Sequence, residues 1–522
     1  MRGGPTRVSS GDTKAASAQS RTAAKVPVHG HAVLHLSIFF LLFAAPLFAI
    51  HSPLFHLPYF WDELGQFIPT ALDLLRDGAW VAHSTLPNIH PPGVETYLVL
   101  WYKLFGYSIP ITRVAMLALA ALGLLILFLL SIELSRGAPG VPSFLPPLLM
   151  IASPLFYTQS MMAQLDMPAM VFTLLALLLF LRERYGYAAL ACVFLVLAKE
   201  TGAVTPAVFF LVLVWRRQFR RASFFLAAPA ALGAWLLILH HATGYWMGNP
   251  GFEHYNVGYS LNPVRIALDV VRRIYYLFFA EFRWIGTLTI ALTARRLWTH
   301  RSNAWIVTGF VFVANLLLVT LFGGAALERY LLPILPVYYI AVSLALVLRP
   351  QWQRVTAGVG LFIGLAASLF WNPAYPFPYE NNYAMVDFVR LQQIAASYVE
   401  ENLPDSTVAT AWPYTAALQH PEYGYVTKPM HVIETNDFHA SSIRAIPANR
   451  YDVLVEYTRT WAPQNGIVGI GWVRELLERF YDYEPPISEQ QCMALGLTPT
   501  IAWQGRGQSI KIYQRIKPLR PK

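Results

Sequence analysis

The apolar stretch VLHLSIFFLLFAAPLFAI, residues 33–50, is soon followed by the tetrapeptide FWDE, residues 60–63. The stretch is close to the length that a helix needs to cross a bilayer. Two adjacent carboxylates are not needed for crossing. Because charge beside hydrocarbon is costly, ionisable residues there usually mark a functional site. The sequence therefore predicts a membrane helix that leads directly into a chemically active loop.

The composition extends this prediction to most of the chain. Of 522 residues, 56% are hydrophobic and only 13% are charged, which is too apolar for a soluble protein with one ordinary core. The apolar residues form blocks of near-bilayer length, which predict a multi-spanning α-helical membrane protein with about eleven spans. The predicted spans are 33–50, 111–132, 143–160, 167–182, 187–199, 203–215, 222–241, 284–296, 304–322, 330–348 and 355–371.

The charges predict an orientation. The net charge is +10, and arginines gather in alternate short loops, as the positive-inside rule expects of cytoplasmic loops. We therefore predict an integral protein of the cytoplasmic membrane with a cytoplasmic N-terminus and an extracytoplasmic C-terminus. No basic stripe with interleaved aromatic residues is present, so a nucleic-acid partner is not expected. The predicted inside arginines are Arg136, Arg182, Arg184, Arg216, Arg217, Arg220, Arg221, Arg295, Arg296, Arg301, Arg349 and Arg354.

Three regions differ in composition. Residues 1–30 are rich in Ser, Ala and Gly and predict a disordered cytoplasmic tail. Residues 31–371 form the membrane module, with the first outer loop at 51–110. Residues 372–522 have no apolar run of bilayer length and predict a small outer α/β domain, with helices near 387–399 and 473–480 and strands near 407–411, 451–457 and 509–514. Cys192 and Cys492 lie far apart in the sequence, and we expect no disulfide between them.

The first outer loop contains the strongest candidates for chemistry. Asp62 and Glu63 follow a membrane helix and are flanked by Phe60 and Trp61. A carboxylate there can accept a proton from an attacking hydroxyl, although an acidic pair can also be a structural salt bridge. His90 precedes a double proline that favours a rigid turn. His90 itself can fix the loop, contact a phosphate or help to bind a metal.

Further candidates lie at the predicted outer ends of later spans. Asp166 is either an N-terminal helix cap or a second active-site acid. Lys199 and Arg329 either snorkel to the interface or cradle a phosphate. The second interpretation is stronger for Arg329, which with Tyr330 abruptly interrupts an apolar region. Lesser candidates are Lys103, Arg272, Arg273 and Arg283.

Taken together, these motifs resemble the multi-spanning GT-C glycosyltransferases. The pattern is most similar to the group that contains the family 39 protein O-mannosyltransferases and the lipid A aminoarabinose transferases, and it covers about residues 30–370. The motifs that carry it are Trp61-Asp62-Glu63, Asp77-Gly78, His90-Pro91-Pro92, Lys103-Leu104-Phe105-Gly106, Asp166 and Arg329-Tyr330-Leu331-Leu332-Pro333.

The resemblance implies an inverting transfer of a sugar from a polyprenyl-phosphate donor to a lipid, glycan or protein on the outer face of the membrane. It assigns Asp62 as the base, with Glu63 supporting it or touching the acceptor. It implies that Asp166 contacts the acceptor or a metal, and that Arg329 binds the donor phosphate. A divalent metal ion is a candidate cofactor, with Asp166 or His90 as its ligand. The segment after residue 372 does not resemble the β-trefoil of eukaryotic protein mannosyltransferases, which weakens the case for a protein acceptor.

Two other functions fit a protein with many helices. A transporter or lipid flippase also contains buried charges, but its sites usually lie near the bilayer midplane, whereas the ionisable residues here cluster in outer loops. A non-catalytic membrane protein that binds partners through its outer domain is the second alternative. Loss of transfer on Asp62→Asn would favour the glycosyltransferase over both.

Overall fold

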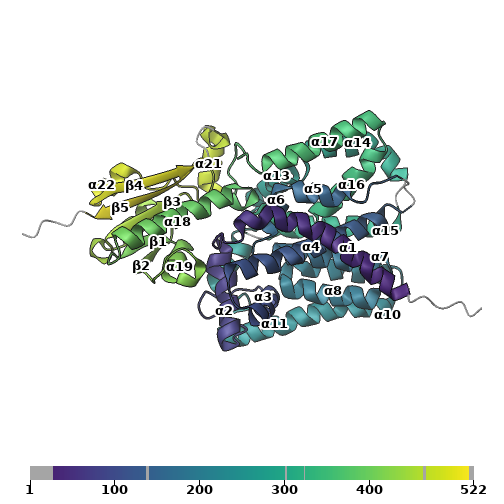
Figure 1. Cartoon of the computed structure of the whole chain (residues 1–522), viewed down its shortest axis with the longest axis horizontal. Helices are drawn as coiled ribbons and strands as arrows, with labels where there is room; N and C mark the ends of the chain where they lie inside the picture. Colours follow the sequence, from purple (N-terminus) through teal and green to yellow (C-terminus); the bar gives the residue numbers. More distant parts are fainter. Residues whose placement is uncertain (1–27, 137–139, 300–301, 323, 463–465, 516–522) are drawn as a thin grey trace, which may run out of the picture.

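Helices occupy one end of the molecule and a mixed β-sheet occupies the other (Figure 1). The computed structural model describes residues 28–136, 140–299, 302–322, 324–462 and 466–515. The helical bundle is built from residues up to 368, and the sheet from residues 408–515. Residues 1–27 of the predicted tail lie outside the described part of the chain.

Each apolar block predicted to span the membrane is helical over most of its length. Within the described part of the chain, four helical segments are long and apolar enough to cross a bilayer, namely Val33–Leu54, Ile109–Leu134, Phe219–Thr243 and Asn303–Leu321, and several shorter apolar helices accompany them. The total of eleven spans therefore stays a prediction. The helices are α1 (Val28–His51), α4 (Ile109–Leu134), α7 (Asp166–Leu181), α8 (Tyr185–Ala198), α9 (Val204–Trp215), α10 (Phe219–Ala222), α11 (Ala227–Thr243), α14 (Trp284–Thr299), α15 (Asn303–Leu321), α16 (Leu335–Val347) and α17 (Gln351–Ser368).

The predicted span at 143–160 is broken into two helices, α5 (Leu145–Ala152) and α6 (Pro154–Gln159). Ser153 between them is extended, with φ −70° and ψ 124°. Pro154 disfavours a helical conformation at the residue before it and lacks an N–H for the helical hydrogen bond. The break directs the chain from α6 into the turn that precedes Asp166.

The first outer loop folds into a helical layer at the end of the bundle that faces the sheet (Figure 1). It contains a π-helical turn, η2 (Glu63–Phe67), which runs into α2 (Ile68–Asp77), and then α3 (Gly93–Phe105). A Cβ atom at Gly93 would lie 2.3 Å from the Leu197 carbonyl oxygen, so glycine lets α3 begin directly against the end of α8. This contact fixes the His90-Pro91-Pro92 turn over the bundle.

The later outer segment is also helical. It contains α12 (Pro250–Glu253), a π-helical turn η5 (His254–Gly258) and α13 (Pro263–Phe278). The Asn262 side chain accepts hydrogen bonds from the Val264 and Arg265 N–H groups, which is the usual way to begin a helix such as α13. A short 3₁₀ turn, η6 (Glu328–Leu331), connects α15 to α16 and brings Arg329 to the same end of the bundle.

The C-terminal residues form a five-stranded sheet in the order β2-β1-β3-β5-β4. β1 is parallel to both β2 and β3, and β5 is antiparallel to both β3 and β4. The strands predicted near 407–411, 451–457 and 509–514 are present as β1, β3 and β5. The elements are η7 (Tyr379–Asn381), α18 (Ala384–Asn402), β1 (Val408–Ala411), α19 (Tyr414–Gln419), β2 (Val432–Thr435), α20 (Ala440–Ala445), β3 (Val453–Tyr457), α21 (Gly471–Phe480), α22 (Glu489–Ala494), β4 (Leu497–Gly505) and β5 (Gln508–Arg515).

The sheet region packs directly on the first outer loop. A Cβ atom at Gly65 would lie 2.3 Å from the Trp412 ring, so only glycine allows this aromatic side chain to lie against η2. The Tyr425 hydroxyl donates to the Tyr59 carbonyl oxygen at 2.7 Å. These contacts place the residues after β1 beside Asp62.

Candidate active site

Arg329 lies at the centre of a cluster of carboxylates from three distant parts of the chain. Its Nη1 donates to Glu380 Oε2 at 2.7 Å, its Nε lies 3.1 Å from Asp166 Oδ2, and its Nη2 donates to Asp62 Oδ2. The arginine is only 5% exposed. A planar guanidinium presents five donors in a fixed fork, so it can hold three acids in one arrangement.

Lys199 supplies the second positive charge of the cluster. Its Nζ donates to Asp166 Oδ1 at 2.5 Å and lies 4.2 Å from the centre of the Tyr330 ring. Asp166 therefore contacts a cation with each of its two oxygens. Three carboxylates face two cations, so the cluster carries one negative charge when all of these groups are ionised.

Glu380 is the member of the cluster that the sequence analysis missed. It lies in η7, after the last apolar block, and is 3% exposed. Burial raises the pKa of the Glu380 carboxyl to about 7, although the Arg329 guanidinium opposes part of this rise. The signal in the sequence was the same as for Asp62, namely an acid next to aromatic residues just beyond an apolar helix.

A cavity of about 1040 Å³ opens onto this cluster. The two cations and the three acids of the cluster line it, and part of its apolar lining comes from α9 and α15. The predicted site residues Asp62, His90, Asp166, Lys199, Arg329 and Tyr330 all line it. The remaining polar lining includes Glu200, Arg272, Glu380 and Arg459, and the apolar lining includes Val204, Leu318, Val319 and Phe322.

His90 also lines the cavity. Its Nδ1 is 2.7 Å from Glu200 Oε2, and its ring packs edge-on against Phe252. The Glu200 carboxylate orients the imidazole through Nδ1, so Nε2 is the ring nitrogen that this carboxylate does not contact. The structure thus connects the His90 turn to the segment between α8 and α9.

Aromatic residues form the part of the cavity nearest the sheet. Trp61 and Trp412 pack edge to face with ring centroids 5.9 Å apart, and the Arg459 guanidinium lies 5.4 Å from the Trp61 ring centroid. Trp61 has a φ of 41°, which is rare for a bulky residue. Strained backbone of this kind is concentrated at functional sites, and here it immediately precedes Asp62.

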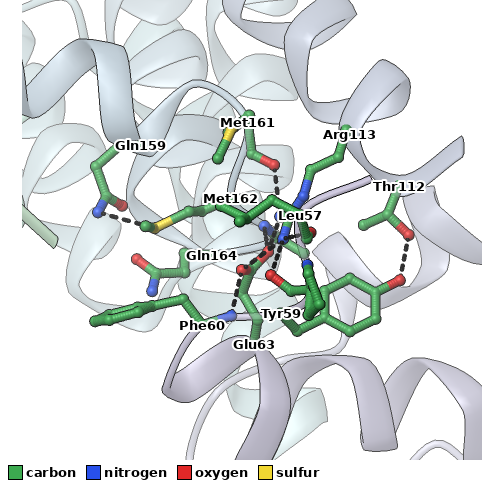
Figure 2. A network of polar contacts seen from close by, with 12 residues as sticks. Leu57, Tyr59, Phe60, Glu63, Thr112, Arg113, Gln159, Met161, Met162 and Gln164 are labelled. Atoms are coloured by element: carbon green, nitrogen blue, oxygen red, sulfur yellow. Dashed lines mark hydrogen bonds and ion pairs between the residues drawn. The ribbon is translucent and has the colours of Figure 1, made fainter. Parts of the chain in front are cut away.

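Glu63 does not line the cavity, in contrast to its neighbour. It is fully buried, and its carboxylate pairs with Arg113 Nη1 at 2.5 Å (Figure 2). The backbone N–H groups of Phe60 and Ala163 also donate to it, at 2.9 and 2.6 Å. Because both carboxylate oxygens are engaged away from the cavity, the geometry does not support the predicted catalytic role.

Arg113 completes this network. Its Nη1 and Nη2 also donate to the carbonyl oxygens of Met161, Leu57 and Pro58 (Figure 2). The pair therefore ties the beginning of the first outer loop to the turn before Asp166. We interpret Glu63 as a positioning residue that holds the backbone on both sides of the cavity.

Lys103 is the second predicted residue that the structure places elsewhere. It lies in the last turn of α3, is exposed and does not line the cavity. A cation in the last turn of a helix interacts favourably with the helix dipole, which accounts for a lysine there. The predicted substrate contact for Lys103 therefore has no geometric support.

The predicted metal ligands have other partners. Asp166 contacts Lys199 and Arg329, and His90 contacts Glu200. Two cations already beside Asp166 oppose the approach of a divalent ion, so the residues present do not fit a metal at this carboxylate. Within the described ranges, the group with suitable spacing is Asp73, Asp77 and His83, which lies outside the cavity and is partly exposed.

Comparison with solved structures places the fold among glycosyltransferases. No protein-family model and no curated protein sequence matches the chain significantly. ArnT from Cupriavidus metallidurans bound to undecaprenyl phosphate is similar with a TM-score of 0.53 and 14% identity, covering 93% of this chain and 98% of ArnT. The same protein in its apo state gives a TM-score of 0.52, with 13% identity over 92% of this chain and 98% of ArnT.

A second glycosyltransferase has a related structure. The archaeal oligosaccharyltransferase AglB from Archaeoglobus fulgidus, in complex with an inhibitory peptide and a dolichol-phosphate, gives a TM-score of 0.50 with 12% identity, over 82% of this chain and 69% of AglB. ArnT and AglB are GT-C glycosyltransferases. These similarities confirm the GT-C fold that the sequence motifs predicted.

Proposed function

We propose that the protein is an inverting glycosyltransferase that moves a sugar from a polyprenyl-phosphate donor to an acceptor on the outer face of the cytoplasmic membrane. One observation carries this proposal. Arg329, Lys199 and Asp62 meet in a cavity that also has an apolar lining, which includes Val204, Leu318, Val319 and Phe322. A lipid-linked sugar has the same three parts: an anionic phosphate, a reacting carbohydrate and an apolar chain. The lipid phosphates bound in the ArnT and AglB structures support the same donor class.

Arg329 is the proposed anchor for the donor phosphate. Its guanidinium fork matches two phosphate oxygens, and Lys199 adds a second positive charge on the same side. Charge develops on the phosphate as the glycosidic bond breaks, and cations already in place stabilise that charge without reorganisation. Val204, Leu318 and Phe322 line the direction in which the isoprenoid chain leaves the phosphate.

Asp62 is the proposed general base. Its side chain is 23% exposed toward the cavity, unlike the enclosed Glu63. In the reaction, the acceptor oxygen forms a bond to the anomeric carbon, and the bond from that carbon to the phosphate oxygen breaks. The phosphate keeps the electron pair, and the acceptor proton passes to Asp62. Attack opposite to the leaving phosphate inverts the anomeric configuration.

The aromatic part of the cavity is the proposed place for the carbohydrate and the acceptor. Trp61 and Trp412 offer apolar ring surfaces, and Arg459 and Thr460 offer polar groups beside them. Binding sites for polar organic ligands commonly combine aromatic walls with a few placed polar groups. Because Trp412 and Arg459 come from the C-terminal segment, this segment is proposed to contribute to acceptor recognition.

Comparative mass spectrometry of cell-envelope lipids, glycans and proteins tests the proposal. Cells that lack the protein should lose one glycosylated species and accumulate its unglycosylated acceptor. Expression of the wild-type chain or of Lys103→Ala, which changes an exposed residue outside the cavity, should restore that species. Asp62→Asn at equal abundance should not restore it. Restoration by Asp62→Asn would contradict the assignment of the base.

The alternative proposal is a transporter or flippase of a lipid-linked substrate. The size and amphipathic lining of the cavity also suit such a molecule. Against this alternative, the charges lie at the end of the bundle beside the sheet, whereas transporter sites usually lie near the midplane. Flux of a lipid-linked sugar across sealed vesicles, without any new covalent product, would decide in favour of transport.

A further inference from the structure

Arg329 has no free face for a phosphate in this structure, because its guanidinium contacts Asp62, Asp166 and Glu380. An incoming phosphate would add negative charge to a cluster that already has one more acid than it has cations. One carboxylate must therefore give up its contact before a lipid phosphate can bind to Arg329. The surroundings of the three acids differ, and these differences indicate which one leaves.

Asp166 and Asp62 do not depend on Arg329 alone. Asp166 is held by Lys199 as well as by Arg329, so its ionised form has two cationic partners. Asp62 is partly exposed to the cavity, where water can solvate a carboxylate. Both carboxylates therefore keep a cation or water beside them when Arg329 turns toward a ligand.

Glu380 has the weakest support for a negative charge. It is 3% exposed, and its Oε2 contacts Arg329 at 2.7 Å and the Gln164 amide at 3.4 Å. Its Oε1 is buried and has no hydrogen-bond partner among the residues that the structure describes. A buried carboxylate that loses its only cation is costly, whereas the same group as a neutral acid is not.

The other groups around Glu380 do not replace that cation. η7 packs against α6 and α18. From α6, Thr158 donates to the backbone carbonyl of Glu380 and not to its carboxylate. On α18, Asp387 is paired with Arg506. Asp62 and Asp166 act on Glu380 as like charges, which favours its neutral form.

We propose that Glu380 is an internal anion that a lipid phosphate replaces on Arg329, and that it leaves the arginine by taking up one proton. The phosphate then contacts the Nη1 group that Glu380 has released. The exchange keeps the charge of the cluster constant, because one carboxylate becomes neutral as one phosphate charge enters. This inference rests on the proposed function, since it assigns Arg329 to the donor phosphate.

The sign of the pH dependence follows from this exchange. Below about pH 7 the neutral form of Glu380 is already populated, so a phosphate binds without proton uptake. Above that pH each binding event must take up a proton, and the dissociation constant should rise by up to about tenfold per pH unit. Replacement of Glu380 by glutamine, which resembles the neutral acid, should remove this dependence.

The test uses the purified full-length protein and farnesyl methyl phosphate. This phosphodiester keeps a single charge from pH 5.5 to 8.5, whereas a phosphomonoester would itself titrate near pH 6. Calorimetric titrations in two buffers of different ionisation enthalpy give the dissociation constant and the number of protons taken up. The wild-type protein should take up close to one proton at pH 8 and far less at pH 6.

Two variants make the test specific. Glu380→Gln should bind the probe at pH 8 with the affinity that the wild-type protein has at pH 6, and should take up no proton. Asp387→Asn is the matched control, because burial also raises the pKa of Asp387, but this acid lies outside the cavity. It should retain the wild-type pH dependence.

The outcomes separate this inference from the proposed function. Tight binding without proton uptake by the wild-type protein, or an unchanged pH dependence in Glu380→Gln, would overturn the exchange and leave the donor site intact. Failure of the probe to bind at any pH would overturn the donor site and the exchange together. If Glu380→Gln does not fold, proton uptake by the wild-type protein alone still decides.

Discussion

Asp62 and Glu63 are adjacent in the sequence, but their side chains have opposite surroundings. The Asp62 carboxylate faces the cavity and contacts Arg329. The Glu63 carboxylate is buried, pairs with Arg113 and accepts hydrogen bonds from two backbone N–H groups. Sequence alone could not separate them, because both acids share the same flanking residues. The difference arises from contacts with the segment around Ala163, a hundred residues later in the chain.

This difference predicts two distinct mutant phenotypes. Glu63→Gln leaves the buried Arg113 without its carboxylate, and breaking a buried ion pair costs about 3–5 kcal/mol. We expect a clear loss of thermal stability in detergent, measured by the fluorescence of buried tryptophans or by aggregation. Asp62→Asn should unfold at the wild-type temperature within a few degrees. Equal unfolding temperatures for Glu63→Gln and the wild-type protein would contradict the positioning role of Glu63.

Arg329→Lys tests the phosphate anchor at the same scale. A lysine keeps the charge but loses the fork that contacts several oxygens at once. Hydrogen bonds to charged groups are each worth about 1.5–3 kcal/mol, so we expect the KM for the lipid-linked donor to rise by about 10- to 100-fold. The KM for the acceptor should change much less. An unchanged donor KM, with Lys103→Ala as the reference variant, would remove Arg329 from the donor site.

At the scale of elements, hydropathy predicted the helices well because each apolar block is continuous in the sequence. The strands of the sheet were harder to predict from the sequence. β2 was missed because most of its four residues are only partly buried, in contrast to the fully buried β1, and β4 because it is mostly exposed and lacks a clean alternation. Strand order depends on pairings between distant residues, which no local pattern encodes. Glu380 had a local signal of the same kind as Asp62, but its cation is 51 residues away, so its place in the cluster could not be predicted.

The contact between η2 and Trp412 gives a prediction at this scale. Gly65→Ala places a Cβ atom 2.3 Å from the Trp412 ring, so the loop and the C-terminal segment must separate. We expect faster proteolysis within residues 372–522 and a weakened acceptor site. Gly186→Ala is the matched control, because a Cβ atom there meets nothing within 4 Å. Equal proteolysis of the two variants would show that this packing does not hold the segment in place.

At the scale of the whole molecule, the two ends of the bundle differ in chemistry. The first outer loop and the sheet lie at one end, and α10 with its arginines lies at the other (Figure 1). Two of the basic residues also contact neighbouring helices there, since Arg182 pairs with Glu133 of α4 and Arg296 donates to the carbonyl of Leu348, which follows α16. This asymmetry matches the loop charges from which the orientation was predicted.

Cysteine labelling tests that orientation. His83 lies in the first outer loop and Arg217 at the α10 end, and both are exposed. The native Cys192 and Cys492 are buried and should react slowly. A membrane-impermeant maleimide should label His83→Cys in sealed spheroplasts and should label Arg217→Cys only after permeabilisation. The reverse pattern would place the cavity on the cytoplasmic side.

The most direct measurement is transfer by the purified protein in liposomes. The protein is given a polyprenyl-phosphate donor whose sugar is radiolabelled. It is also given the unglycosylated acceptor, extracted from cells that lack the protein. The wild-type chain should move the label to the acceptor with inverted anomeric configuration and release polyprenyl phosphate. Asp62→Asn should be slower by at least about 100-fold, the usual contribution of a general base. Equal rates for the two proteins, or release of lipid phosphate without a glycosylated product, would contradict catalysis by the Asp62–Arg329 cavity.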